Sequence, residues 1–184
     1  MTARTPVRRR ATRLAATSAL FASLALSGCT TGVNVADACP AAPTATKAPD
    51  GISDNLSSKP AVKLPSGAKP TTLQVLDVKK GDGPVACSGD ALTVKYVGVT
   101  YDNGKQFDAS WDRGQDFPFT IGQMAVIEGW DKGLLGMQKG GRRELIIPPA
   151  LGYGTQGAGK DIPPGATLAF VVDLVDVTKA AGQK

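Results

Sequence analysis

The sequence predicts an α+β domain in which a curled antiparallel β-sheet wraps around one short α-helix. Two observations support the sheet: short segments of alternating apolar and polar residues begin at Leu73, and turn-forming runs such as Gly-Asp-Gly-Pro at 81–84 separate them. A third observation supports the single helix, because residues 127–137 place apolar side chains three and four positions apart. Several antiparallel strands and one covering helix define this fold class.

The strands are expected where the alternation is clearest, at Leu73–Val78, Leu92–Thr100, Phe117–Ile121, Arg143–Ile147 and Thr167–Val177. In the last segment, every second residue from Leu168 to Leu174 lies on one face and is apolar. The helix is expected from Ile127 to Met137, with Trp130 and Leu134 on its apolar face. Glycines at 129, 133 and 136 weaken its propensity, so it should be short and held by packing.

The first 28 residues have the layout of a secretory signal peptide. Five arginines and no acidic residue precede Cys29, and an apolar run extends from Leu14 to Leu26. This run is shorter than the roughly 17 residues that span a bilayer. The residues Leu26-Ser27-Gly28-Cys29 resemble the bacterial lipobox, which implies cleavage before Cys29 and diacylglycerol on its sulfur. We therefore expect an extracytoplasmic protein that is lipid-anchored to the cell membrane; an ordinary signal peptide or an uncleaved anchor is the alternative.

Four regions follow from these patterns. Residues 1–28 are the predicted lipoprotein signal peptide, and residues 29–70, rich in Ala, Pro, Thr, Ser and Lys, are the predicted flexible tether. Residues 71–178 form the predicted folded domain and residues 179–184 a C-terminal tail. With Cys29 assigned to lipid, Cys39 and Cys87 remain as an even pair, which predicts either a disulfide or two free thiols.

Composition excludes several classes of function. The chain has no histidine, which rules out Ser-His-Asp triads, His-assisted cysteine nucleophiles and His-containing zinc sites. The formal charge of +5 arises before Cys29, and without those five arginines the chain has 16 basic and 16 acidic residues. The charge of the remaining chain therefore gives no electrostatic reason to expect a nucleic-acid partner. Nine of the ten aromatic residues lie between Tyr96 and Phe170, which predicts an apolar pocket with little reactive chemistry. We expect no metal and no cofactor.

Five blocks of sequence carry a resemblance to a known family: 94–98 (Val-Lys-Tyr-Val-Gly), 104–110 (Gly-Lys-Gln-Phe-Asp-Ala-Ser), 126–130 (Val-Ile-Glu-Gly-Trp), 152–154 (Gly-Tyr-Gly) and 162–168 (Ile-Pro-Pro-Gly-Ala-Thr-Leu). In this order and spacing they resemble the FKBP-type peptidyl-prolyl cis-trans isomerases, which bind macrolides such as tacrolimus. The resemblance extends from about Leu73 to Val177.

The resemblance implies a set of site residues. Asp108, Tyr153 and Tyr96 would be catalytic, with polar contacts from Asp108 and the Tyr153 hydroxyl, a backbone N–H from Ile127 to hold a substrate carbonyl, and Trp130 as the pocket floor. The implied substrate-binding residues are Tyr96, Phe107, Asp108, Arg113, Phe117, Val126, Ile127, Trp130, Tyr153, Ile162 and Phe170. Arg113 is expected either to pair with Asp108 or to be solvated. Two positions depart from the family pattern at the pocket rim: Ala158 replaces a common histidine, and Asp161 replaces a common apolar residue.

The implied function is acceleration of X-Pro rotation in unfolded or partly folded exported proteins. Such chemistry needs no nucleophile, metal or cofactor, because an apolar pocket favours the twisted, less dipolar peptide over the planar one. Two rival hypotheses are a noncatalytic module that grips a proline-containing loop and a holdase chaperone. A solute-capturing lipoprotein fits poorly, because such proteins usually need two lobes and this chain has room for one. We expect a monomer.

Overall fold

The computed structural model describes Cys39, residues 43–48 and residues 50–182 of the chain. The predicted signal peptide and the predicted lipidation site Cys29 lie outside the described residues. The described elements are β1 (Thr46–Lys47), β2 (Gln74–Lys79), β3 (Ala91–Thr100), β4 (Gln106–Ala109), α1 (Ser110–Arg113), β5 (Phe117–Thr120), α2 (Glu128–Gly133), β6 (Arg142–Ile147), the 3₁₀ turn η2 (Pro149–Leu151) and β7 (Leu168–Thr178).

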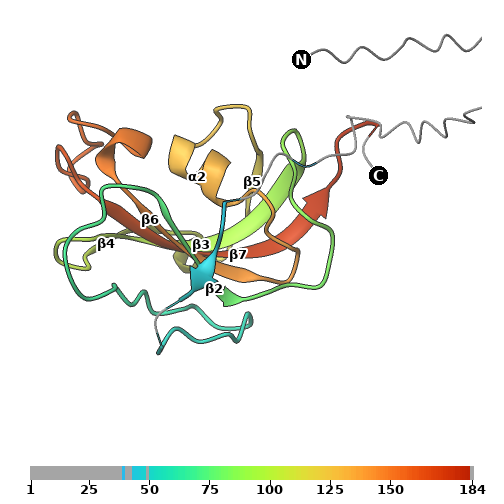
Figure 1. The fold of residues 1–184 in the computed structure, drawn as a ribbon, viewed down its shortest axis with the longest axis horizontal. Coiled ribbons are helices and arrows are strands. Elements are labelled where there is room, and N and C mark those ends of the chain that lie inside the picture. The colour runs from blue at the N-terminus through green and yellow to red at the C-terminus, as the bar shows by residue number, and fades with distance from the viewer. Residues whose placement is uncertain (1–38, 40–42, 49, 183–184) are drawn as a thin grey trace, which may run out of the picture. The chain divides into compact units, whose positions relative to one another are not determined.

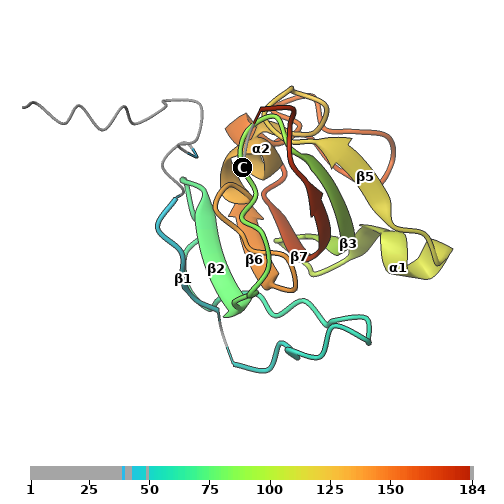
Figure 2. The same ribbon diagram turned by 90° about the vertical axis from the view of Figure 1, so that its right-hand side faces the viewer.

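One seven-stranded sheet organises the described residues, in the order β1-β2-β6-β7-β3-β4, with β5 also paired to β3 (Figure 2). The eleven-residue strand β7 pairs antiparallel with β6 on one side and with β3 on the other. β5 pairs with the first part of β3 and β4 with its later part, so both flank the same edge. The predicted all-antiparallel sheet needs one correction: β1 pairs parallel with β2, and the sheet is mixed.

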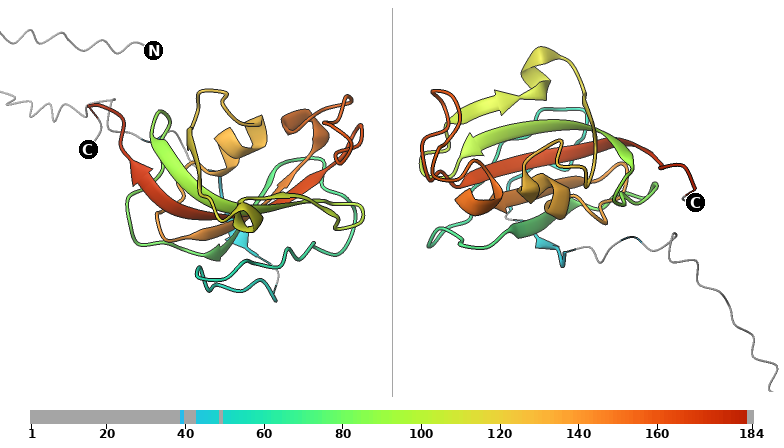
Figure 3. Two further views of the ribbon diagram at one scale, coloured as in Figure 1. Left: turned by 180° about the vertical axis from the view of Figure 1, so that it is seen from behind. Right: turned by 90° about the horizontal axis from the view of Figure 1, so that it is seen from above.

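Helix α2 lies in the hollow of the curled sheet, as the views in Figures 1 and 3 show. Close approach requires a glycine on the helix, because a Cβ at Gly129 would stand 2.5 Å from the Ile147 side chain on β6. The Arg143 guanidinium of β6 donates to the carbonyl of Gly133 at 2.9 Å and to the Asp77 carboxylate at 2.7 Å. A buried arginine thus joins the C-terminus of α2 to two strands.

The predicted helix differs from the observed one in length. It ends at Gly133, not Met137, because the chain turns away through Gly136, whose φ is 73°. Leu134 and Met137 are nevertheless buried in the main core, as their spacing predicted. Two further short elements, α1 and η2, were not predicted, so the helical part of the fold is more than one helix.

The opposite face of the sheet is covered by residues 50–65, which we call the strap (Figure 1). Ile52 is buried in a second apolar cluster with β-strand residues, and Val62 and Leu64 pack against that cluster. The fully buried Arg142 pairs with Asp173 and also donates to two strap carbonyls, 2.5 Å to that of Ser53 and 3.1 Å to that of Ser58.

The strap corrects the prediction that residues 29–70 are a flexible tether. The part of that segment from Thr46 contributes a strand to the sheet and then packs along its face. The Tyr101 hydroxyl also donates to the Pro65 carbonyl at 3.0 Å. Composition suggested a linker because the apolar residues of the strap are widely spaced, and the arginine that binds its carbonyls lies far away in sequence.

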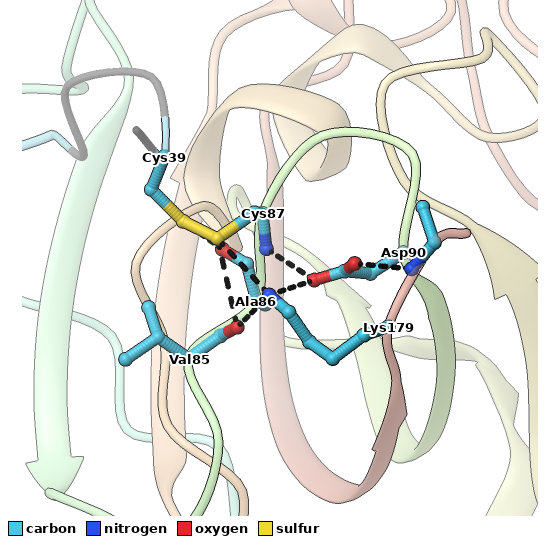
Figure 4. The surroundings of a disulfide bond; sticks show 7 residues. Cys39, Val85, Ala86, Cys87, Asp90 and Lys179 are labelled. Atoms are coloured by element: carbon cyan, nitrogen blue, oxygen red, sulfur yellow. Dashed lines mark hydrogen bonds and ion pairs between the residues drawn. A yellow bond between two sulfur atoms is a disulfide. The ribbon is translucent and has the colours of Figure 1, made fainter. Parts of the chain in front are cut away.

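A disulfide joins Cys39 to Cys87, the pairing that the even cysteine count offered (Figure 4). Their Cα atoms lie 4.9 Å apart and they are 48 positions apart in sequence. The loop-closure model assigns such a bridge about 4 kcal/mol of stabilisation. Beside it, the buried Asp90 carboxylate accepts hydrogen bonds from the Cys87 N–H, the Ala180 N–H and the Lys179 ammonium, at 2.8, 2.9 and 2.8 Å.

These contacts also bear on the predicted C-terminal tail, since Lys179 and Ala180 are bonded to the domain rather than free of it. None of the helices in the described part of the chain combines the length and apolar character that a membrane crossing requires.

Candidate active site

A cavity of about 170 Å³ opens between α2, β3 and the loops around them. Its lining is mostly aromatic and aliphatic, and it comprises Tyr96, Phe107, Asp108, Phe117, Ala125, Val126, Ile127, Trp130, Tyr153 and Phe170. These residues come from β3, β4, β5, β7, α2 and two loops. The sheet therefore gathers side chains that are far apart in sequence around one small apolar volume.

The rings of the pocket pack edge to face around Trp130. The Trp130 ring centroid lies 5.2 Å from that of Tyr96 and 5.3 Å from that of Phe170, with interplanar angles of 82° and 84°. Phe107 in turn meets Phe170 at 5.4 Å and 84°. These are preferred aromatic geometries. Gly98 makes this packing feasible, because a Cβ there would lie 2.6 Å from Phe170 and 2.8 Å from Phe107.

Three polar side chains meet at the mouth of the cavity. The Tyr96 hydroxyl donates to one oxygen of the Asp108 carboxylate, and the Arg113 guanidinium donates to the other. The same guanidinium donates to the Tyr96 hydroxyl oxygen at 2.9 Å. Asp108 lies on β4 and Arg113 ends the single-turn helix α1 that follows, so the local chain path brings the two together.

Burial and these bonds act on the pKa values in opposite directions. Burial tends to raise the pKa of Asp108, but hydrogen bonds from Tyr96 and Arg113 outweigh it and hold that pKa below its ordinary value. Burial, together with the bond to Asp108, raises the pKa of Tyr96 to about 12. Burial also raises the pKa of Tyr153. At neutral pH the site therefore presents one carboxylate and two neutral hydroxyls.

Most of the predicted substrate-binding residues line this cavity, and two do not. Arg113 reaches the site only through its bonds to Asp108 and Tyr96. Ile162 lines an adjoining cavity, which shares Phe107, Asp108 and Tyr153 with the first. Sequence reasoning missed Ala125, which lines the main cavity but gives no signal of its own as a small residue in a loop.

The two rim departures noted in the sequence lie in the adjoining cavity. Ala158 and Asp161 both line it, and the Lys105 ammonium meets the Asp161 carboxylate at 3.1 Å. This ion pair ties the loop around residue 161 to the turn before β4. Among the described residues, no cluster of three or more acidic or cysteine side chains is arranged to hold a metal ion.

Comparison with known proteins identifies the family. Residues 83–175 match the family model of the FKBP-type peptidyl-prolyl cis-trans isomerases. The chain is 53% identical, over 120 residues, to the FK506-binding protein of Streptomyces anulatus, covering 65% of this chain and 97% of that one.

Two solved structures agree. The crystal structure of AtFKBP13 matches at 39% identity and a TM-score of 0.54, covering 59% of this chain and 94% of that one. The peptidyl-prolyl cis-trans isomerase of Pseudomonas syringae pv. tomato matches at 33% identity and a TM-score of 0.52, covering 58% and 76%.

A curled sheet around a short helix, with an aromatic pocket between them, defines the fold class of these isomerases. This chain belongs to the FKBP-type peptidyl-prolyl cis-trans isomerase family, and it is a peptidyl-prolyl cis-trans isomerase.

Proposed function

We propose that the aromatic cavity holds the proline of a client chain while its X-Pro bond rotates, and that the clients are exported proteins. The observation that carries the proposal is the aromatic pocket lined by Trp130, with the Asp108, Tyr96 and Arg113 cluster at its mouth. Cis X-Pro bonds exchange slowly enough to limit folding, so such a site assists the folding of its clients.

The pocket accelerates rotation through differential solvation and hydrogen bonding. Rotation meets a barrier of about 18 to 20 kcal/mol because amide resonance must break, and the twisted state is less dipolar. Transfer from water into an aromatic cavity costs the twisted state less than the planar one. Each 1.36 kcal/mol removed from the barrier raises the rate about tenfold.

Polar groups at the rim position the substrate. Within the described residues, neither the Tyr153 hydroxyl nor the Ile127 amide N–H has a hydrogen-bond acceptor, and both residues line the cavity. We assign both as donors to substrate carbonyls. Asp108, fixed by Arg113 and Tyr96, supplies the negative charge next to the rotating bond.

The test is the cis-to-trans rate of an X-Pro tetrapeptide with the purified full chain. Asp108→Val removes the negative charge beside the rotating bond, and Tyr153→Phe removes one hydrogen bond to the substrate. Each should lower kcat/KM about tenfold. Tyr101→Phe is the matched control, because the Tyr101 hydroxyl binds the strap carbonyl of Pro65 instead. Wild-type rates in both pocket variants would refute the assigned roles.

The pocket is also proposed to bind FK506 (tacrolimus), the compound in the name of the Streptomyces relative. The drug should compete with the tetrapeptide in the same assay. Acceleration that the drug leaves unchanged would contradict this and would point to the altered rim at Ala158 and Asp161.

The exported location is supported by the arginine-rich start, the apolar run and the lipobox-like residues before Cys29. A lipid on Cys29 would anchor the chain to the outer face of the cell membrane, because each buried methylene contributes about 0.8 kcal/mol. After expression in a bacterium, the wild-type chain should fractionate with membranes and incorporate labelled palmitate, whereas Cys29→Ser should do neither. Label in the Cys29→Ser chain would refute the proposed anchor site.

A further inference from the structure

One wall of the pocket is a loop, residues 121–127, that joins β5 to α2. Ala125, Val126 and Ile127 from this loop line the cavity. The loop makes an unusual turn: Gly122 has a φ of 77°, and Met124, with a φ of 55°, is the one non-glycine residue with a positive φ in the part of the chain described. An L-residue in that conformation is strained, so surrounding contacts must hold it there.

One side chain on α2 makes two hydrogen bonds to the backbone in the middle of this loop. The Asp131 carboxylate accepts a hydrogen bond from the Gly122 N–H at 2.8 Å on one oxygen and from the Met124 N–H at 3.0 Å on the other. Bonds to an ionised acceptor are stronger than neutral ones. Asp131 directly follows Trp130 in α2. These two hydrogen bonds therefore fix the loop to the helix turn that carries Trp130.

The ends of the loop are fixed by backbone bonds. Ile121 donates to the Asp90 carbonyl at 3.0 Å and accepts from the Gly89 N–H at 2.8 Å. At the other end, the Ile127 carbonyl accepts from the Trp130 N–H at 2.9 Å as α2 begins. The stretch between these anchors carries the wall residues, and there the Asp131 carboxylate supplies two bonds to the backbone.

We propose that Asp131 is a positioning residue for proline isomerisation, which sets the distance of loop 121–127 from Trp130 and the aim of the Ile127 N–H. The inference rests on the proposed use of this cavity as the catalytic site. Misplacing a reacting group by about 1 Å costs up to roughly a hundredfold in rate. A loop released from Asp131 keeps its side chains but not their placement over the substrate.

Three variants of the full chain test the proposal in the tetrapeptide assay. Asp131→Ala removes both acceptors and should lower kcat/KM about tenfold. Asp131→Asn keeps one acceptor and should give an intermediate value. Glu128→Ala is the matched control: it removes a carboxylate from the same turn of α2, whose partner is the exposed Lys132, and it should keep wild-type kinetics.

Amide hydrogen exchange separates positioning from folding. In Asp131→Ala, the protection of the Gly122 and Met124 amides should fall, while that of the β3 and β7 amides should stay at the wild-type level. Should the alanine variant fail to fold, the asparagine variant provides the same comparison. Wild-type kcat/KM in a folded variant that has lost protection at Gly122 and Met124 would overturn the inference, as would an equal loss in Glu128→Ala.

Asp108→Val, measured in the same assay, separates the positioning role of Asp131 from the use of the cavity as the active site. If Asp108→Val is impaired and Asp131→Ala is not, the cavity remains the active site and only the positioning role fails. If Asp108→Val is as active as the wild type, the use of the cavity itself is refuted.

Discussion

Asp108, Tyr96 and Tyr153 are held in fixed protonation states by their surroundings. The bonds from Tyr96 and Arg113 keep the pKa of Asp108 low, whereas burial raises the pKa values of both tyrosines, that of Tyr96 to about 12. The chain also contains no histidine that could titrate near neutrality.

We therefore predict that kcat/KM is independent of pH between about pH 6 and pH 9, where none of these groups changes charge. The loss at acid pH should follow Asp108, because its carboxylate is present only above its lowered pKa. Tetrapeptide assays across this range check the prediction. A bell-shaped profile centred near neutrality would contradict it and would require another ionising group.

Trp130 combines two roles, since it lines the pocket and is 4% exposed in the main apolar cluster. Trp130→Ala should lower the free energy of unfolding by about 3 to 5 kcal/mol, because the surrounding rings cannot collapse into the vacated volume. Urea denaturation measures this directly. An unfolding curve that matches the wild type would refute the packing role.

At the residue scale, the sequence predicted the large aromatic side chains of the pocket. The aromatic residues of the pocket stood out by type and by motif, and they line the cavity. Ala125 and Asp131 did not stand out, because a small loop residue and a helix-surface carboxylate look ordinary until the loop and helix are placed together.

At the scale of elements, the strap acts as part of the domain. Its removal would expose the Arg142 and Asp173 pair, whose side chains are 0% and 4% exposed, and would withdraw the carbonyls of Ser53 and Ser58 from Arg142. The loss of two hydrogen bonds from a charged donor is costly.

We predict that a chain beginning at residue 71 is less stable than one beginning at residue 43 by at least about 3 kcal/mol, from lost apolar burial and lost hydrogen bonds. Both chains lack Cys39, so the disulfide does not affect the comparison. Urea denaturation of the two provides the measurement. Equal stability would show that the strap contributes little.

Elements with strong local signals were predicted closely, and those that depend on distant partners were not. Strands β2, β3, β5, β6 and β7 each lie within one or two residues of the predicted bounds. The two-residue strand β1 and the strap lie in a stretch whose composition resembles a linker. The strand β1 is held by its pairing with β2, and the strap is held in part by Arg142, although an arginine in a strand normally suggests a solvent-facing position.

At the scale of the whole molecule, pH should act on stability through a second buried acid. Glu144 is fully buried on β6, on the same face as Ile146, and its carboxyl oxygens have no hydrogen-bond partner in the described part of the chain. Burial raises the pKa of Glu144 to about 8. The folded protein therefore holds a neutral acid at pH 7 where the unfolded chain carries a charge.

The direction of the stability change with pH follows from the linkage between proton binding and folding. Because the folded pKa of Glu144 exceeds the unfolded one, its contribution is fully present below the unfolded pKa and is lost as pH rises through about 8. We predict that the wild type loses stability relative to Glu144→Gln over this window, by roughly 5 kcal/mol in total. Urea denaturation at several pH values measures the difference, with the exposed Glu128→Gln as control. A constant difference would contradict the prediction.

The disulfide also decides which parts of the molecule bear mechanical load. A pull applied to the chain on the N-terminal side of Cys39 passes through the covalent bridge to Cys87 and from there into β3. The strap, β1 and β2 lie in the closed loop between the two cysteines and carry none of that tension. With the bridge reduced, the same pull would act first on the two-residue strand β1, which would peel from the sheet edge.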